Sequence, residues 1–328
     1  MAVRALACLG TIAVLLSACS EDEATGAGGG TTTGAGAGAG GSGGQTTSDT
    51  GGQTTSGSGG EAGAGGAPCK GCDDVVNSNV GFEDGTFLNQ WQRSSNNGED
   101  CQMSVFTGNA RSGTHALHVT HSVQGSGNFN RCEVVSSEQL DPGASRTGRF
   151  SWDTEYWLGY SIYLEDWATD PAGWNVLGQT HAIPFDNDWS CCSGPQFWEV
   201  TTTLDQFRVA YSIVADPYVT PVCSGGYSYW ETPLGPMQNK WTDVVIHFNA
   251  SVGSGGFVEV WIDGSQVIDQ QGSVLYAYDS CGRPRTEELL LQMGSYKTTS
   301  STNYRSVYYD EIRIVGATGS YQAVAPRD

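Results

Sequence analysis

The sequence predicts an all-β fold, an antiparallel two-sheet sandwich of the jelly-roll type with one concave face left open. Segments that alternate apolar and polar residues recur along the chain, and they are rich in aromatic and β-branched side chains. Gly, Asn, Asp or Pro separates these segments, and none sustains an amphipathic helical pattern beyond two turns. Repeated short strands without helices are typical of sandwiches and barrels.

Five segments carry this alternation most clearly, and we expect each to be a strand. They are residues 115–121, 156–164, 207–214, 244–248 and 257–262. Asp263-Gly264 follows the last of them and predicts a tight hairpin, because Asp-Gly suits a two-residue turn between antiparallel strands.

Residues 1–19 have the pattern of an export signal. Arg4 precedes an apolar run that is too short to span a membrane as a helix. Small residues before Cys19 resemble a bacterial lipoprotein cleavage box, which implies that Cys19 is lipidated, and Ser20 after it favours sorting to the outer membrane. The alternative is an ordinary signal peptide. We expect an exported outer-membrane lipoprotein, at the cell surface or in the periplasm.

Residues 20–72 predict a disordered tether, because they are almost wholly Gly, Ala, Ser and Thr and have little apolar surface to bury. The roughly 44 residues from Thr25 to Pro68 have a typical reach of about 35–40 Å when flexible. Residues 73–328 form the single folded domain that we expect.

The cysteine count predicts disulfide bonds. Ten cysteines occur in the chain, and eight remain when Cys8 and Cys19 are set aside. An even number in an exported protein implies disulfides, but sequence alone leaves their connectivity open. These eight are Cys69, Cys72, Cys101, Cys132, Cys191, Cys192, Cys223 and Cys281.

The formal charge of −20 restricts the partners. Nucleic acid is excluded as a partner by this acidity, and a densely sulfated glycan is disfavoured because such polyanions are met by Lys and Arg clusters. A polyuronate of modest charge density, or a neutral glycan, is compatible with it. We expect a monomer that touches the membrane only through its lipid.

Three short motifs carry the candidate chemistry: Arg-x-Glu at Arg131 and Glu133, Gln-x-His at Gln179 and His181, and Gly-x-Tyr ending at Tyr296. Alternate residues of a strand share a face, so each pair projects from one side. If the three strands line one groove, they offer a cation, an amide, an imidazole and a phenol to one ligand. That set suits removal of a proton beside a carboxylate, which indicates cleavage of a polysaccharide by β-elimination.

In the order of its segments, the domain resembles the β-jelly-roll polysaccharide lyases, in particular the heparin-lyase-I-like and glucuronan-lyase-like group. Its three motifs are similar to those of jelly-roll alginate lyases. The other matching segments are residues 81–85, 111–117, 156–164, 240–247, 256–264 and 307–313.

The resemblance implies catalytic roles for four residues. His181 and Tyr296 would transfer protons, while Arg131 and Gln179 would hold the carboxylate of the uronate. Glu133 is expected to be a buried partner that orients Arg131. Whether His181 or Tyr296 is the base depends on the stereochemistry of the substrate. The chemistry requires no cofactor.

One position departs from the family pattern. Gln292 stands where the last motif usually has a lysine, two residues before its glycine. Lys297 could replace the lost cation, although on a regular strand it would face away from Tyr296. Gln292 and Lys297 are therefore candidate substrate-binding residues, together with Trp189, which is the tryptophan expected to stack on a sugar ring.

A structural calcium ion is a separate expectation. Glu83, in a turn with Asp84 and Gly85, and Asp310, on the last predicted strand, resemble the calcium site of many jelly rolls. Simple turn chemistry is the alternative at this site.

Two other functions remain open. A non-catalytic glycan-binding jelly-roll lipoprotein would keep the groove and lack competent chemistry, and Gln292 favours this alternative. A sandwich glycoside hydrolase ranks last, because no strand carries the Glu-x-Asp-x-x-Glu pattern of such enzymes.

Overall fold

The computed structural model describes residues 81–87, 91–95, 101–122, 130–136, 148–182, 197–221, 227–285, 288–297 and 303–327. The predicted signal, Cys19, the tether and Trp189 lie outside the described residues. Within the described ranges there is no helix with the length and hydropathy needed to span a bilayer.

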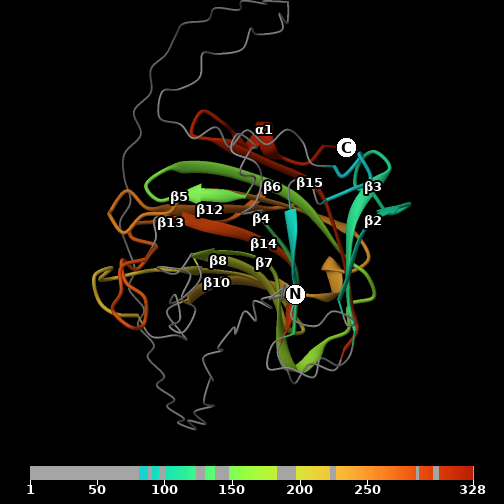
Figure 1. Cartoon of the computed structure of the whole chain (residues 1–328), viewed down its shortest axis with the longest axis horizontal. Coiled ribbons are helices and arrows are strands. Elements are labelled where there is room, and N and C mark those ends of the chain that lie inside the picture. Colours follow the sequence, from blue (N-terminus) through green and yellow to red (C-terminus); the bar gives the residue numbers. More distant parts are fainter. Residues whose placement is uncertain are drawn as a thin grey trace, which may run out of the picture. The chain divides into compact units, whose positions relative to one another are not determined.

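The described strands form two antiparallel sheets (Figure 1). The eight-stranded sheet runs in the order β1 (Trp91–Ser95), β4 (Asn130–Ser136), β14 (Glu288–Lys297), β7 (Asp170–Ala182), β8 (Trp198–Leu204), β9 (Gln206–Ser212) and β10 (Tyr227–Pro233), and β5 (Arg149–Ser151) also pairs with β14. The seven-stranded sheet runs in the order β13 (Ser265–Gln271), β12 (Phe257–Ile262), β11 (Trp241–Asn249), β6 (Glu155–Leu164), β15 (Arg305–Gly316), β3 (His115–His121) and β2 (Cys101–Thr107). The short helices are η2 (Gly235–Met237) and α1 (Tyr321–Val324).

This architecture confirms the predicted all-β sandwich. Strands β3, β6, β9, β11 and β12 occupy the five predicted segments, with boundaries that differ by a few residues at most. The predicted hairpin joins β12 to β13, and Asp263 and Gly264 have positive φ angles of 47° and 81° as a two-residue turn of this kind requires.

The core lies between the sheets and is filled by aromatic and aliphatic side chains from both. Phe150, Trp198 and Phe207 enter it from the eight-stranded sheet, and Tyr156 and Phe248 enter it from the other. Period-2 alternation produces this core, because every second residue of a strand faces the opposite sheet. The strand residues that alternate with these core residues therefore line the outer faces of the two sheets.

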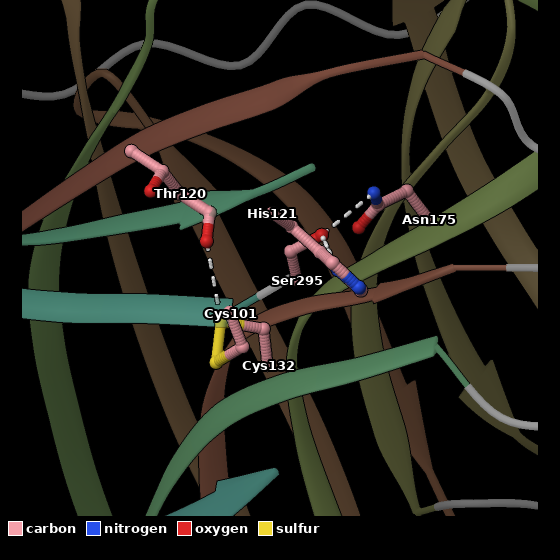
Figure 2. The surroundings of a disulfide bond; sticks show 6 residues. All are labelled: Cys101, Thr120, His121, Cys132, Asn175 and Ser295. Atoms are coloured by element: carbon pink, nitrogen blue, oxygen red, sulfur yellow. Dashed lines mark hydrogen bonds between the residues drawn. A yellow bond between two sulfur atoms is a disulfide. The ribbon is translucent and has the colours of Figure 1, made fainter. Parts of the chain in front are cut away.

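A disulfide joins the sheets next to one of the predicted motifs. Cys101 on β2 is bonded to Cys132 on β4, with Cα atoms 5.3 Å apart (Figure 2). Cys281 is also disulfide-bonded. The expected disulfide chemistry is thus present among the described cysteines, and Cys69, Cys72, Cys191, Cys192 and Cys223 lie outside the described residues.

Candidate active site

The three motif strands are neighbours in the eight-stranded sheet, where β14 lies between β4 and β7. Tyr296 pairs directly with Arg131 on one side of β14, and Gln292 pairs directly with Gln179 on the other. Direct cross-strand partners project their side chains to the same face, with Cβ atoms about 4.5–5.5 Å apart. Strands far apart in the sequence therefore bring the motif residues together.

These side chains lie on the face turned away from the seven-stranded sheet. Their chain neighbours Cys132, Val134, Leu291, Met293 and Ala182 belong to the core between the sheets. Because consecutive strand residues point in opposite directions, the motif residues project from the outer side.

A chain of hydrogen bonds connects the three strands on this face. The amide nitrogen of Gln179 donates to Glu133 Oε1 at 2.9 Å and to Gln292 Oε1 at 3.1 Å. All three side chains are at most 4% exposed. Since both N–H groups of Gln179 are used, its donation to a substrate carboxylate would require one of these bonds to exchange. Gln292 accepts through its oxygen, so its amide nitrogen is the donor that this chain leaves unused.

Arg131 is held by an acid and an aromatic ring. Its Nε lies 3.1 Å from Glu133 Oε2, and its guanidinium carbon lies 4.6 Å from the centre of the Tyr296 ring. The edge of Trp174 packs on the same tyrosine, with ring centres 5.0 Å apart. Burial raises the pKa of Glu133, while Arg131 and the hydrogen bond from Gln179 oppose that rise. The arrangement places a cation against the phenol ring.

His181 is neutral and fixed in one tautomer. Its Nδ1 lies 2.8 Å from the carbonyl oxygen of Ala182, so Nδ1 carries the proton and donates it in this bond. The lone pair of the neutral ring is then on Nε2. Burial, together with the positive charges of Arg131 and Arg285, lowers the pKa of His181 to about 3, against the effect of the Ala182 bond. The imidazole is thus neutral near physiological pH, and its Nε2 can accept a proton.

The inner side of the same strands fixes the site from behind (Figure 2). Ser295 precedes Tyr296, and its Oγ lies 3.1 Å from His121 Nδ1 on the other sheet and accepts from Asn175 Nδ2 at 3.0 Å. Gly294 has a φ of 150°, and a Cβ there would lie 2.2 Å from the carbonyl oxygen of Cys132. The glycine of the Gly-x-Tyr motif is therefore required by close strand contact.

The structure does not bring Lys297 to this face. Its Nζ donates to the carbonyl oxygens of Ser122 at 2.7 Å and Asn303 at 3.1 Å, and the residue is 1% exposed. The expectation that Lys297 could replace the missing lysine is therefore wrong. The physical reason is strand alternation, which directs it to the opposite side from Tyr296.

The two candidate calcium ligands lie close together. A Cβ added to Gly81 would be 3.7 Å from Asp310 Oδ1 and 3.9 Å from Glu83 Oε1. Glu83 Oε1 accepts from the backbone N–H groups of Thr114 and His115, both at 3.0 Å. Burial raises the pKa of Asp310 to about 6, and the negative charge of Glu83 adds to the rise. No group of three or more His, Cys, Asp or Glu side chains that could hold a metal occurs among the described residues.

The outer face continues beyond the motifs in a row that the sequence analysis did not identify. Gln179 pairs directly with Glu199 on β8, Glu199 with Ala210 on β9, and Ala210 with Tyr229 on β10. Arg208 lies beside this row, with its guanidinium carbon 4.1 Å from the centre of the Tyr229 ring. Alternation could have placed each side chain on a face, but the strand order that aligns them is a tertiary property.

Comparisons with known proteins agree with this fold. A family model described as polysaccharide lyase matches residues 82–313. An endo-β-1,4-glucuronan lyase from the fungus Trichoderma reesei is similar in structure, with 19% identity, a TM-score of 0.54, and coverage of 74% of this chain and 97% of that chain. A family 7 alginate lyase, A1-II′, in complex with substrate has 12% identity, a TM-score of 0.48, and coverage of 74% and 99%. No curated protein sequence matches the chain.

Proposed function

Because the chain belongs to the polysaccharide lyase family and is a polysaccharide lyase, we propose that it cleaves a uronic-acid-containing polysaccharide by β-elimination. The observation that carries the proposal is the cluster of Arg131, His181 and Tyr296 on one face of three adjacent strands. It combines a neutral base, a phenol and a cation, which are the groups that β-elimination beside a carboxylate uses.

The reaction breaks the C5–H and C4–O4 bonds of a uronate and forms a C4–C5 double bond. His181, through Nε2, takes the C5 proton, and the phenol of Tyr296 gives a proton to the departing O4. When the C5 proton lies on the tyrosine side, Tyr296 first gives its own proton to His181, the resulting phenolate takes the C5 proton, and the phenol then returns that proton to O4. Negative charge that develops on the carboxylate is stabilised by Arg131 and by the amide N–H groups of Gln292, and Gln179 adds a donor when one of its two present hydrogen bonds exchanges.

The hydrogen-bond chain supports an altered role for Gln292. A buried Glu133 orients Gln179, and Gln179 in turn orients Gln292. Gln292 would then present its amide nitrogen to the carboxylate in place of the lysine of the family pattern. A neutral donor supplies less stabilisation than a cation, which favours a substrate of low charge density.

We take the substrate to lie along the outer face, in a groove that follows the row from Gln292 to Tyr229. Neighbouring strands are about 4.8 Å apart, so β7 to β10 spans about 14 Å, enough for several sugar rings. The fungal structure is that of an endo-β-1,4-glucuronan lyase, and this makes glucuronan the first substrate to test.

The test is a panel of glucuronan, alginates, pectate, hyaluronan, heparan sulfate and heparin, with products identified by mass. A lyase product contains an unsaturated uronate and lacks the water that a hydrolase adds. We expect this product from one polyuronate. A hydrated product would contradict the reaction, and binding without any product would favour the second candidate, a glycan-binding protein, which the neutral Gln292 supports.

We also propose that the domain is tethered to the outer membrane through a lipid on Cys19. The small residues before this cysteine support the proposal. In a bacterial host, the full chain is expected in the membrane fraction and Cys19→Ala in the soluble fraction. Equal partitioning of the two would contradict the anchor.

A structural calcium ion held by Glu83 and Asp310 is the last part of the proposal. Two adjacent carboxylates with a raised pKa at Asp310 fit a hard cation that takes oxygen ligands. The ion would stabilise the fold and take no part in the chemistry.

A further inference from the structure

Arg285 is a buried cation close to the proposed active site, and the reaction described above gives it no role. It lies in the segment that leads into β14, three residues before Glu288, and is 6% exposed. Its Nη1 donates to the carbonyl oxygen of Tyr276 over a long 3.4 Å, and its buried Nε has no hydrogen-bond partner. Among the described residues, no carboxylate lies within ion-pair distance of its guanidinium.

The turn that carries Arg285 is firmly held. The carboxylate of Asp279 accepts from the backbone N–H groups of Cys281 and Arg283, at 2.9 and 3.0 Å, and from Arg283 Nε at 2.7 Å. Arg285 itself donates its backbone N–H to Ala277 at 3.0 Å, and Cys281 is disulfide-bonded. The backbone position of Arg285 is therefore set by the fold.

Because of this turn, Arg285 lies near the end of the site that contains His181. The strand that follows it pairs Leu289 with Ala182 and Leu290 with His181. The charge of Arg285 also acts on His181, since it lowers the pKa of the imidazole as Arg131 does. Both guanidinium groups are thus within electrostatic reach of one histidine.

A buried and poorly paired guanidinium is costly, because desolvation of a charge must be offset by hydrogen bonds or an opposite charge. Burial lowers the pKa of Arg285 to about 10, although the negative charge of Asp279 opposes this. Asp279 is already committed to Arg283 and to the turn. Within the described part of the chain, Arg285 is therefore a cation without a paired anion. It lies close to the position where Gln292 replaces the lysine of the family pattern.

We propose that Arg285 is a substrate-binding residue, and that its guanidinium binds a carboxylate of the uronate chain at the His181 end of the site. It supplies from a loop the positive charge that Gln292 does not provide. The assignment rests on the proposed function and adds that two arginines, Arg131 and Arg285, meet the acidic substrate. A bidentate bond from the guanidinium to the carboxylate satisfies the unpaired donor.

The test measures binding separately from turnover. Arg285→Gln and Arg285→Lys are prepared in a His181→Ala background, and titration calorimetry follows binding of a glucuronan oligosaccharide and of its carboxyl-reduced, neutral counterpart. Lys240→Gln is the matched control, because it removes one positive charge from an exposed pair with Asp263 on the other sheet. Thermal unfolding of each variant is measured in parallel.

We expect Arg285→Gln to weaken binding of the acidic oligosaccharide about tenfold or more, and Arg285→Lys to weaken it less. Binding of the neutral oligosaccharide and the Lys240→Gln control should be unchanged. Equal losses for both ligands, or none in a folded variant, would overturn the assignment. If Arg285→Gln fails to fold, a Lys variant that binds both ligands like its parent would also overturn it. Lack of any uronate binding by the parent would reject the proposed function as well.

Discussion

At the scale of single residues, the site depends on which groups are charged. His181 is unprotonated at neutral pH, because burial, Arg131 and Arg285 keep its pKa near 3, far below its ordinary value. Glu133 remains useful as an acceptor because Arg131 and Gln179 compensate for its burial. In the proposed reaction, the proton-transfer group and the carboxylate-binding groups thus share one set of charges, and a change in one alters the others.

Glu199 is expected to limit activity on the alkaline side. Burial raises its pKa to about 7, with Arg208 opposing, and its cross-strand neighbours are Gln179 and Ala210. Below that pH the carboxyl is neutral and accepts an acidic sugar beside Gln179. Above it, the carboxylate repels the substrate, so kcat/KM for a polyuronate should fall as pH rises through about 7.

The measurement is the pH profile of kcat/KM for the wild type and Glu199→Gln. The variant should lose the fall near neutral pH, because its side chain does not ionise. Lys240→Gln, far from this face, should keep the wild-type profile. An unchanged alkaline limb in Glu199→Gln would assign that limb to another group.

At the scale of elements, the strand β4 is fixed on both sides. Its outer residues Arg131 and Glu133 belong to the site, and Cys132 between them is bonded to β2 of the opposite sheet. Ser295 similarly links β14 to His121 on β3 while its neighbour Tyr296 faces outward. Arg131 and Tyr296 are therefore each adjacent to a residue that anchors its strand to the other sheet.

Removal of the disulfide is expected to destabilise the domain. In Cys101→Ser/Cys132→Ser the unfolded chain regains the freedom of a loop with a sequence separation of 31 residues. The free energy of unfolding should fall by about 2–4 kcal/mol. Denaturant unfolding of the variant and the wild type checks this, and equal midpoints would show that the bond is not a stabilising element.

At the scale of the whole molecule, the sequence predicted the sandwich and the shared face of each motif pair, because both depend on period-2 alternation. The segment 257–262 with its Asp263-Gly264 turn is β12 and its hairpin, as expected. Alternation also predicts that Lys297 faces away from Tyr296, and the structure agrees, because Lys297 Nζ donates to the carbonyl oxygen of Ser122. Glu199 and Arg285 were not predicted, because strand order and loop position are set by contacts between segments far apart in the chain.

Calcium is expected to stabilise the whole domain if Glu83 and Asp310 bind it. An ion at about 100 times its Kd adds about 2.7 kcal/mol, which corresponds to a rise in Tm of about 5–10 °C for a domain of this size. Thermal unfolding with calcium and with a chelator measures the effect. Glu83→Gln should make Tm insensitive to calcium, and magnesium serves as the control ion. An equal Tm for the wild type with and without calcium would contradict the site.

The most direct test of the central claim compares the initial rates at which the wild type, His181→Ala and Tyr296→Phe form an unsaturated uronate. The substrate is the polyuronate that the panel identifies, and the product is followed by its near-ultraviolet absorbance. Loss of a proton-transfer group should lower kcat about 10²- to 10⁴-fold in each variant, while the variants stay folded and bind the glycan. A variant that forms the product at the wild-type rate would show that its residue does not transfer the proton, and two such variants would contradict the site as described.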